Sequence, residues 1–492
     1  MHLAELIAAS KVAFGTSGAR GLAVHMTDRI CYAYTKAFLQ YLEEKQNFLP
    51  GAKVALAGDL RESTERILAA VARAIVDMGY GIDYCGKIPT PALCLYGLRR
   101  AMPTIMVTGS HIPEDRNGIK FTKKDGEILK RDEAGLMDQP IELDENLFDE
   151  QGMLVGESFL SPPNRKAADE YVQRYTHFFS PGCLNGLTIG LYAHSAVGRE
   201  LTGDILEHLG ATVTPLARSK SFIPVDTEAI RPEDRQLAAK WAGDFGFDAI
   251  VSTDGDGDRP LISNENGEWL RGDVTGILCA RDLGAEAVVL PVSCNTALEM
   301  SEVFEAVYRT RIGSPYVIEG MQQAASGGYE RVVGYEANGG FLTATPVHKN
   351  SRILHELPTR DALIVIISVL RQANERQIPV SALVRQLPKR YTYSDRLTSF
   401  PSKRSREILA FFNTGESGKD KQRIAHAFGD LVPEVRYVDR TDGLRITAQS
   451  GDILHIRPSG NAPELRCYTE AASEAGAQNL NEQLIHILDS WR

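Results

Sequence analysis

Three apolar runs along the chain are each followed by a polar turn and then by an amphipathic stretch. The runs cover residues 53–57, 187–192 and 287–292. A short apolar run bounded by turn residues predicts a buried strand, and apolar positions recurring every three or four residues predict a helix. We expect the helices at about residues 62–78, 198–209 and 295–307. Strand, turn and helix in this order are typical of α/β structure.

The spacing of these units predicts several domains. The three runs begin 134 and 100 residues apart, which is too far for a solenoid repeat. Three related α/β domains with mixed sheets therefore fit better than the alternative, one large α/β sheet.

The end of the chain follows a different pattern. Short strands separated by polar turns are predicted at residues 435–438, 444–447 and 453–456, with a helix at about 476–488. This pattern is typical of an antiparallel α+β domain. The predicted domains cover residues 1–160, 161–262, 263–389 and 390–492.

Composition narrows the class of protein. Hydrophobic residues make up 43% of the 492 residues, which excludes a disordered chain and a small disulfide-stapled scaffold. The formal net charge of −10 argues against nucleic acid or a membrane surface as a partner. The seven cysteines are scattered without a Cys-x-x-Cys pair, and no apolar run approaches the ~20 residues of a membrane helix. We expect a soluble cytoplasmic protein without a zinc site.

Two loops carry the clearest chemistry. The first contains Ser110 and His111 and follows the apolar strand at residues 104–107, at the strand end where α/β sheets place reacting groups. A polar turn is the alternative interpretation. The second alternates Asp254, Asp256 and Asp258 with glycines after the strand at residues 247–252.

The alternating carboxylates predict a magnesium site, because glycines let the backbone turn tightly enough for three carboxylates to converge on one hard cation. An EF-hand also has aspartates at these spacings. It is disfavoured because Arg259 stands where that loop needs glycine and because a strand precedes the loop. A solvated acidic turn is the remaining alternative.

Three further loops predict binding of anions and hydroxyls. Residues 14–21, with Thr16, Ser17 and Arg20, could cradle an anion. Glu336 and Asn338 could read sugar hydroxyls, although an Asn-Gly hairpin would look the same. The third loop suits a phosphate dianion, although a surface turn is equally compatible. It contains Arg457, Ser459, Gly460, Asn461 and Arg466.

In their order and content the five loops resemble those of the α-D-phosphohexomutase superfamily, the phosphomannomutases and phosphoglucomutases. The resemblance extends from Phe14 to Arg466. It implies that Ser110 carries a phosphoryl group, and that Mg²⁺ is held by the three aspartates together with an oxygen of phospho-Ser110. It makes Arg20 and Lys120 candidate general acids or bases beside His111, and Arg259 a further positive charge.

The resemblance also implies the substrate-binding residues. Glu336 and Asn338 match a sugar-reading pair, and Arg311 and Gly313 lie in a neighbouring specificity loop. The loop from Arg457 to Asn461 matches a phosphate-binding loop.

The chain departs from the family pattern at several positions, which affects substrate preference. Ile112 replaces Asn, Asn338 replaces Ser, and Gly340 stands where many members have His. The pair Asn461–Ala462 replaces Thr-Glu, so Arg466 could supply part of the lost contact.

The function implied is that of a phosphohexomutase acting on small sugar phosphates, with mannose 1-phosphate and mannose 6-phosphate favoured. The reaction would pass through a hexose 1,6-bisphosphate, which would also serve as activator, and the enzyme would be a monomer or small homo-oligomer. A phosphoglucomutase or a phosphoglucosamine-type mutase is the alternative among mutases. A phosphatase and a non-catalytic sugar-phosphate-binding protein are alternatives of other classes.

Overall fold

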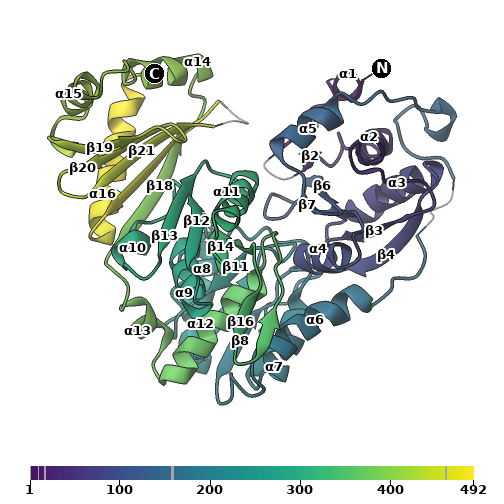
Figure 1. Ribbon diagram of the computed structural model, residues 1–492, viewed down its shortest axis with the longest axis horizontal. Coiled ribbons are helices and arrows are strands. Elements are labelled where there is room, and N and C mark those ends of the chain that lie inside the picture. The colour runs from purple at the N-terminus through teal and green to yellow at the C-terminus, as the bar shows by residue number, and fades with distance from the viewer. Residues whose placement is uncertain (1, 9, 16–17, 157–159, 460–462) are drawn as a thin grey trace. The chain divides into compact units, whose positions relative to one another are not determined.

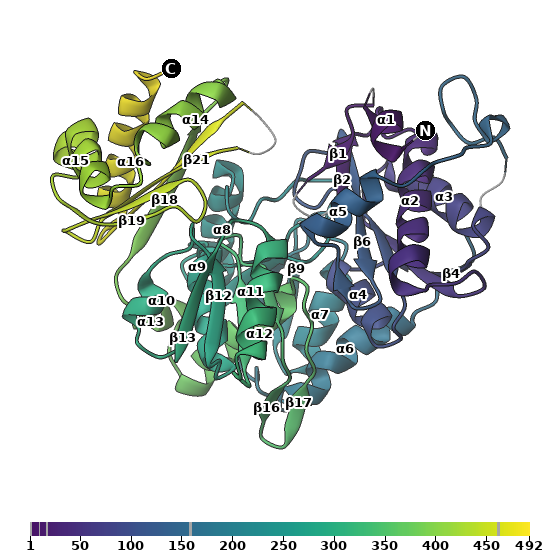
Figure 2. The ribbon, with the colours of Figure 1, turned by 45° about the horizontal axis from the view of Figure 1, so that its top comes forward.

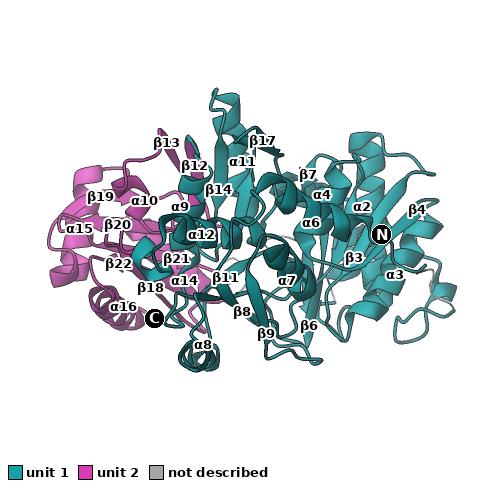
Figure 3. Ribbon diagram, turned by 90° about the horizontal axis from the view of Figure 1, so that it is seen from below, with its two compact units in different colours: residues 1–286, 314–384 teal, residues 287–313, 385–492 magenta. Residues whose placement is uncertain are grey.

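The computed structural model describes the whole chain except residues 1, 9, 16–17, 157–159 and 460–462. The described residues form helices and mixed or antiparallel sheets, and none of their helices is long and apolar enough to cross a membrane. The chain divides into two compact units (Figure 3). Unit 1 contains residues 1–286 and 314–384, and unit 2 contains residues 287–313 and 385–492.

The first sheet of unit 1 is mixed. Its strands are β1 (Ala13–Phe14), β2 (Ala19–Leu22), β3 (Lys53–Gly58), β4 (Gly81–Lys87), β5 (Thr104–Val107), β6 (Arg116–Lys123) and β7 (Gly126–Glu127). They follow the order β1-β2-β6-β5-β3-β4, with β7 paired to β6. Figure 1 labels β2, β3, β4, β6 and β7 of this sheet. Strand β3 is parallel to β4 and β5, whereas β6 is antiparallel to β2, β5 and β7. The parallel neighbours β3 and β5 therefore end at the same edge of the sheet.

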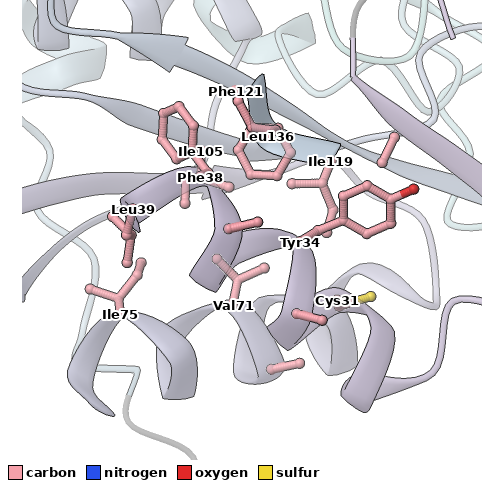
Figure 4. Close-up of a cluster of buried hydrophobic side chains, with 14 of the residues drawn as sticks. Cys31, Tyr34, Phe38, Leu39, Val71, Ile75, Ile105, Ile119, Phe121 and Leu136 are labelled. Atoms are coloured by element: carbon pink, nitrogen blue, oxygen red, sulfur yellow. The ribbon is translucent and has the colours of Figure 1, made fainter. Parts of the chain in front are cut away.

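Helices cover this sheet, and its central strands β3 and β5 are buried on both faces. The helices of this region are α1 (Leu3–Ile7), α2 (Asp28–Gln46), α3 (Thr64–Asp77), α4 (Thr90–Leu98), α5 (Lys130–Met137) and a short 3₁₀ turn, Glu145–Leu147. Figure 4 shows Phe38 of α2 against Phe121 of β6, with ring centroids 4.8 Å apart. Val71 and Ile75 of α3 are spaced one helical turn apart and face the same cluster (Figure 4).

A second, four-stranded sheet follows in unit 1. It contains β8 (Thr188–Tyr192), β9 (Thr212–Leu216), β10 (Ala249–Thr253) and β11 (Pro260–Ile262), in the order β11-β10-β8-β9. Strands β10, β8 and β9 are parallel, and β11 is antiparallel to β10. The helices are α6 (Lys166–Phe178), α7 (Arg199–His208) and α8 (Pro232–Phe245). The β10–β11 connection is the loop of alternating aspartates, so a turn between two buried strands fixes its position.

The rest of unit 1 contains two hairpins and four helices. The elements are α9 (Gly272–Asp282), α11 (Ser314–Ser326), β14 (Val332–Tyr335), β15 (Phe341–Thr343), β16 (Val347–Lys349), β17 (Arg352–Leu354), α12 (Ala362–Arg376) and α13 (Val380–Val384). Strands β14 and β15 pair antiparallel, as do β16 and β17. Asp361 caps α12 by accepting from the Leu363 amide at 3.3 Å, and Tyr171 of α6 donates to the same carboxylate at 2.8 Å.

Unit 2 combines a parallel strand pair with an antiparallel sheet. Its elements are β12 (Ala287–Pro291), α10 (Ala297–Met300), β13 (Ala306–Thr310), β18 (Tyr391–Leu397), α14 (Ser402–Phe411), α15 (Ser417–Phe428), a 3₁₀ turn (Gly429–Leu431), β19 (Val435–Asp439), β20 (Leu444–Ala448), β21 (Ile453–Pro458), β22 (Leu465–Ala471) and α16 (Glu474–Asp489). Strands β12 and β13 are parallel. The antiparallel sheet follows the order β18-β22-β21-β20-β19, and α16 packs against β18 and β22 (Figure 2).

The predicted helix at residues 295–307 is wrong over its second half. Helix α10 ends at Met300, Glu302 takes a left-handed φ of +52°, and Ala306 already pairs with Ala287 in a parallel strand. The sequence of β13, with Val307, Tyr308 and Thr310, is rich in β-branched and aromatic residues, which favour a strand. The apolar spacing that predicted a helix here comes from a short helix followed by a strand.

Candidate active site

Ser110 lies in the turn that follows β5 and is completely buried. Its Oγ donates to Asp254 Oδ2 at 2.6 Å and lies 3.3 Å from His111 Nδ1. Its φ of +56° is in the left-handed region, which costs a non-glycine residue about 1–3 kcal/mol. The surrounding contacts must therefore hold this backbone in place.

Those contacts come from Asp59 and Arg61, in the turn after the parallel neighbour β3. Asp59 Oδ2 accepts from Thr108 Oγ1 at 2.8 Å and from the Gly109 amide at 3.3 Å. The Arg61 guanidinium, whose side chain is fully buried, donates to the carbonyls of four loop residues. They are Ser110 at 2.9 Å, Ile112 at 2.6 Å, Pro113 at 2.6 Å and Arg116 at 3.0 Å.

Gly109 is required by this arrangement, because a Cβ there would lie 2.7 Å from the Arg61 guanidinium. The serine loop is therefore wrapped around one buried cation.

The aspartate loop, which contains Asp254, Asp256 and Asp258, packs closely against the serine loop, which contains Ser110. A Cβ at Gly255 would lie 2.6 Å from the Ser110 carbonyl oxygen, so glycine allows the two backbones to approach. Asp254, Asp256 and Asp258 are at most 1% exposed, and one carboxylate oxygen from each lies within 4.8 Å of the others. Burial, and then the charges of Asp258 and Asp256, raise the pKa of Asp254 well above its ordinary value.

The three carboxylates fit a hard divalent cation. The Oδ1 atoms of Asp256 and Asp258 are buried and have no hydrogen-bond partner among the described residues. Buried carboxylate oxygens without a donor are costly unless a cation binds them. A solvated acidic turn is excluded by the burial, and an EF-hand by the flanking strands β10 and β11.

Lys120, on β6, supplies one positive charge to this cluster. Its Nζ lies 2.6 Å from Asp256 Oδ2 and 2.7 Å from Asp258 Oδ2. Burial lowers the pKa of Lys120, but the two aspartates more than offset that effect, so its pKa lies above the usual value. Lys120 is therefore a proton donor in this arrangement. Thr90, at the start of α4, also donates its hydroxyl to Asp256.

Arg20, on β2, provides a second positive charge close enough to interact with Asp256 and Asp258. The residue is half-buried, and its buried Nη2 has no hydrogen-bond partner among the residues that the structure describes. Burial, together with the charges of Arg259 and Arg360, lowers the pKa of Arg20 to about 10. A guanidinium whose buried Nη2 has no acceptor among the described residues is suited to an anionic ligand. Thr16 and Ser17, predicted in the same loop, lie outside the described residues.

His111 is neutral. Its Nδ1 lies 2.9 Å from Nη1 of Arg259, and a guanidinium can only donate, so Nδ1 is an acceptor. Burial, and then the charges of Arg259 and Arg20, hold the pKa of His111 far below its usual value. His111 can accept a hydrogen bond here, but the same surroundings make it a poor base and prevent it from serving as a charged acid.

Glu336 lies directly after β14 and is joined to the aspartate loop by Arg360. Arg360 Nη1 donates to Glu336 Oε2 at 3.2 Å, and Arg360 Nε donates to Asp258 Oδ2 at 3.1 Å. Asn338 is part of the hairpin turn: its Oδ1 accepts from the Gly340 amide at 2.9 Å, and its carbonyl accepts from Thr227 Oγ1 at 2.7 Å. The loop is therefore an Asn-Gly hairpin and also places Glu336 next to the cluster.

Unit 2 contains the remaining predicted residues. Arg457 Nε lies 2.7 Å from Asp442 Oδ2, and the same oxygen accepts from the Ile312 amide at 3.0 Å. Asp442 thus links the predicted phosphate loop to the segment between Arg311 and Gly313. Arg457 and Arg466 are register partners on β21 and β22, and the Ser459 amide donates to the Glu464 carbonyl at 2.9 Å.

Gly460 and Asn461, which complete the predicted phosphate loop, lie outside the described residues, as does Ala462.

Four residues that contact the serine or aspartate loop were not predicted from the sequence: Asp59, Arg61, Thr90 and Arg360. Asp59 and Arg61 had a usable signal, because a polar turn at the carboxyl end of a parallel strand lies beside the turn of its neighbour. Arg360 had none, since it lies in an irregular segment between β17 and α12 and meets its partners only through the fold.

Family models match the chain in four consecutive segments. The models describe domains I, II and III of phosphoglucomutase/phosphomannomutase, each alpha/beta/alpha, and the C-terminal domain of the same enzymes. The matched residues are 11–145, 169–267, 271–391 and 414–487.

Similar proteins agree with these matches. A phosphomannomutase from Salmonella muenchen is 43% identical over 99% of this chain and 97% of its own length. A phosphomannomutase from Sinorhizobium fredii is 42% identical over 97% of this chain and 98% of its own length.

Solved structures show the same fold. A phosphoglucomutase/phosphomannomutase family protein from Burkholderia thailandensis has a TM-score of 0.71 at 19% identity, with 97% of each chain covered. The phosphoglucomutase pp63/parafusin from Paramecium has a TM-score of 0.70 at 15% identity, covering 96% of this chain and 93% of its own.

Full-length relatives above 40% identity are phosphomannomutases, and the four matched segments carry the domains of the same family in order. The chain belongs to the phosphoglucomutase/phosphomannomutase family and is a mutase, an isomerase.

Proposed function

We propose that this mutase interconverts mannose 1-phosphate and mannose 6-phosphate. The observation that carries the proposal is the contact between Ser110 Oγ and Asp254 Oδ2, 2.6 Å apart inside a buried cluster of carboxylates and cations. Phosphoryl transfer depends on positioning and on neutralising charge, and this cluster supplies both. Mannose is favoured over other hexoses because two full-length relatives above 40% identity are phosphomannomutases.

The reaction would begin with transfer from phospho-Ser110 to the free hydroxyl of the hexose monophosphate. A bond forms between phosphorus and the sugar oxygen, the bond between phosphorus and Ser110 Oγ breaks, and the hydroxyl proton passes to a base. The product is a hexose 1,6-bisphosphate, which must turn over before its other phosphate returns to Ser110. Added hexose 1,6-bisphosphate would phosphorylate an empty Ser110, so we propose it as activator.

Asp254, Asp256 and Asp258 would hold Mg²⁺ together with an oxygen of phospho-Ser110. The ion, when bound, neutralises charge at the phosphoryl group. The carboxylate oxygens of Asp256 and Asp258 that lack a hydrogen-bond donor support this role.

The cations of unit 1 would bind the transferring phosphoryl oxygens. The buried Arg259 and the half-buried Arg20 lie close enough to each other and to His111, the neighbour of Ser110, for their charges to interact. Lys120 holds a proton at Nζ and could deliver it to Ser110 Oγ as the phosphorus bond breaks. His111 would act as an acceptor.

Other residues would bind the parts of the substrate that do not react. Glu336 and Asn338 would bind sugar hydroxyls, and Arg311 and Gly313 would belong to a specificity loop. Thr16 and Ser17 would join Arg20 in anion binding. The phosphate that does not react would be bound by Arg457, Ser459, Gly460, Asn461 and Arg466.

Three further expectations accompany this proposal. We propose domain boundaries near residues 160, 262 and 389, and a monomer or small homo-oligomer. We also propose a cytoplasmic location, which is supported by the free thiols of all seven cysteines.

The sugar preference is tested with mannose 1-phosphate, glucose 1-phosphate and glucosamine 1-phosphate assayed side by side. We expect the highest kcat/KM for mannose 1-phosphate and no net release of inorganic phosphate. A higher kcat/KM for another sugar would contradict the assignment of mannose as the preferred substrate. Steady release of inorganic phosphate would indicate a phosphatase.

The roles of Ser110 and of the metal are tested separately. Intact-mass measurement should show a phosphate adduct on the wild-type chain that Ser110→Ala lacks, and EDTA should abolish turnover until Mg²⁺ is restored. Asp256→Asn should weaken binding of the metal, measured by titration calorimetry. An active chain that never carries phosphate would refute the covalent route.

A further inference from the structure

Arg360 is a buried cation between the aspartate loop and the sugar-reading loop. It is 2% exposed. Its Nε and Nη2 lie 3.1 and 3.0 Å from Asp258 Oδ2, and its Nη1 donates to Glu336 Oε2 at 3.2 Å. One guanidinium thus joins two carboxylates that come from different loops.

The space for Arg360 depends on Gly340. A Cβ at Gly340 would lie 2.4 Å from Arg360 Cδ and 2.7 Å from its Cγ. Gly340 is not among the glycines with a positive φ, so its backbone does not itself require glycine. The absent side chain, at a position where many members of the family have histidine, is therefore what admits the Arg360 stem.

We infer that Arg360 is a positioning residue for the mutase reaction: it fixes Glu336 relative to the metal-binding carboxylate Asp258, and the glycine at position 340 leaves room for it. A planar guanidinium can donate from two edges at once, whereas a lysine ammonium is a single point of charge. The geometry leaves Asp258 Oδ1 open to the cluster and leaves Glu336 with one carboxylate oxygen that Arg360 Nη1 does not occupy.

The consequence concerns alignment of the sugar. Glu336 can place a sugar hydroxyl for transfer only if its own position relative to Ser110 is fixed. Arg360 provides that connection through Asp258, whose loop also contacts Ser110 through Asp254. Misalignment by about 1 Å can cost on the order of 100-fold in rate, so loss of the connection should affect both substrate binding and turnover.

The competing explanation is that Arg360 only neutralises buried carboxylates and stabilises the fold. Arg174 provides a matched control, because its side chain is also 2% exposed, lies 3.7 Å from Asp361 and donates to the His355 carbonyl at 2.8 Å. Both arginines are therefore buried and paired with a carboxylate, but none of the contacts described for Arg174 involves Glu336 or Asp258.

The first experiment compares Arg360→Lys, Arg360→Met and Arg174→Met. We measure thermal unfolding, kcat and KM per folded molecule, and the affinity for hexose 1,6-bisphosphate by calorimetry. Both methionine variants should unfold at lower temperature. Only Arg360→Met should lose kcat/KM, by about 10- to 100-fold, the range for a charge-assisted hydrogen bond, and Arg360→Lys should recover part of it. Wild-type kinetics in Arg360→Met would overturn the inference.

A second variant avoids the loss of a buried charge. Gly340→Ala keeps every ionisable group but places a methyl against the Arg360 stem. It should reproduce part of the kinetic defect of Arg360→Met, and the two changes together should be no worse than Arg360→Met alone. Additive effects would show that the two positions do not act through a shared space.

The inference rests on the proposed mutase reaction, but the two can fail separately. A wild-type chain inactive on every hexose phosphate would refute the proposed function. The affinity for hexose 1,6-bisphosphate would still test Arg360, since a wild-type value in Arg360→Met would then refute the positioning role.

Discussion

At the scale of single residues, the serine loop is held by two charged side chains, Arg61 and Asp59, neither of which is among the residues proposed to bind substrate or metal. Arg61 binds the carbonyls of the loop, and Asp59 binds its amide and threonine hydroxyl. The left-handed backbone of Ser110 can persist because these contacts determine the path of the chain on both sides of it. The position of Ser110 therefore depends on the turn after β3.

Replacement of Arg61 by methionine should lower both stability and turnover. It leaves Asp59 as a buried carboxylate without its charged partner, which costs about 3–5 kcal/mol of unfolding free energy. Turnover per folded molecule should fall because Ser110 loses its fixed direction. Chemical denaturation and single-turnover transfer from phospho-Ser110 check the two effects.

The double variant Asp59→Asn with Arg61→Met separates these effects. Removing both charges should recover part of the stability but none of the transfer rate. Recovery of both together would mean that the pair matters only for folding.

The sequence indicated the residues of the proposed site better than the side chains that hold them in place. Ser110, the three aspartates, Lys120, Arg20 and Glu336 gather in one region of unit 1, as the loop chemistry and the family resemblance led us to expect. Arg360 could not be predicted, because its partners lie 102 and 24 positions away along the chain. Long-range ion pairs leave no local periodicity or motif in the sequence.

At the scale of elements, helices and strands were predictable where a long stretch kept one period. Helix α3 keeps its apolar positions on one face over its whole length, and the structure places it within the predicted residues 62–78. Helix α10 and strand β13 were merged into one predicted helix because each is too short to show a period of its own. Strands β18 and β22 were not predicted, although they pair over seven residues.

Helix α16 offers a test of local stabilisation. Ser473 caps it by accepting from the Gly476 amide at 3.1 Å. Ser473→Ala should lower the unfolding free energy of unit 2 by about 1 kcal/mol, because one amide of the first turn loses its partner. Ser402→Ala, at an exposed position at the start of α14, is the control and should change stability by less than about 0.5 kcal/mol. Thermal unfolding measures both, and equal effects would contradict the capping role.

At the scale of the whole molecule, the two units carry different parts of the proposed reaction. All the residues proposed for phosphoryl transfer and metal binding belong to unit 1, whereas the proposed phosphate loop belongs to unit 2. Within unit 2, Asp442 accepts from Ile312 and pairs with Arg457, and its carbonyl accepts from His455 Nε2 at 2.7 Å. One turn thus joins three strands or loops of unit 2.

Arg457→Ala should raise KM before it lowers kcat. An arginine that binds the phosphate that does not react acts equally on the ground state and the transition state. The expected change is about 30- to 150-fold in KM, with more hexose bisphosphate escaping into solution. Arg436→Ala, at an exposed position on β19, is the control. Steady-state kinetics, with bisphosphate release measured in parallel, tests this prediction. If KM and bisphosphate release were both unchanged, the loop would be a surface turn without a role in binding.

Unit 2 should also lose stability in mild acid because of His455. Burial lowers the pKa of His455 from 6.5 to about 4. Between those values the unfolded chain binds a proton that the folded chain does not, so stability falls as pH falls from about 6.5 to 4, by on the order of 3 kcal/mol. His455→Gln should remove this part of the pH dependence. Denaturation of both proteins across that range checks it, and parallel pH profiles would contradict it.

Unit 2 is assembled from two stretches of chain, residues 287–313 and 385–492, with a stretch of unit 1 between them. During synthesis the first stretch leaves the ribosome well before its partners exist. Strands β12 and β13 can pair with each other, but unit 2 cannot be completed until the last residues are made. Every residue of unit 1 has been made once Val384 is added, so we expect unit 1 to fold while the following residues are translated, and unit 2 to fold only after residues 385–492 have emerged. A message truncated between codons 385 and 492 would then yield a chain with an intact aspartate loop and an incomplete unit 2.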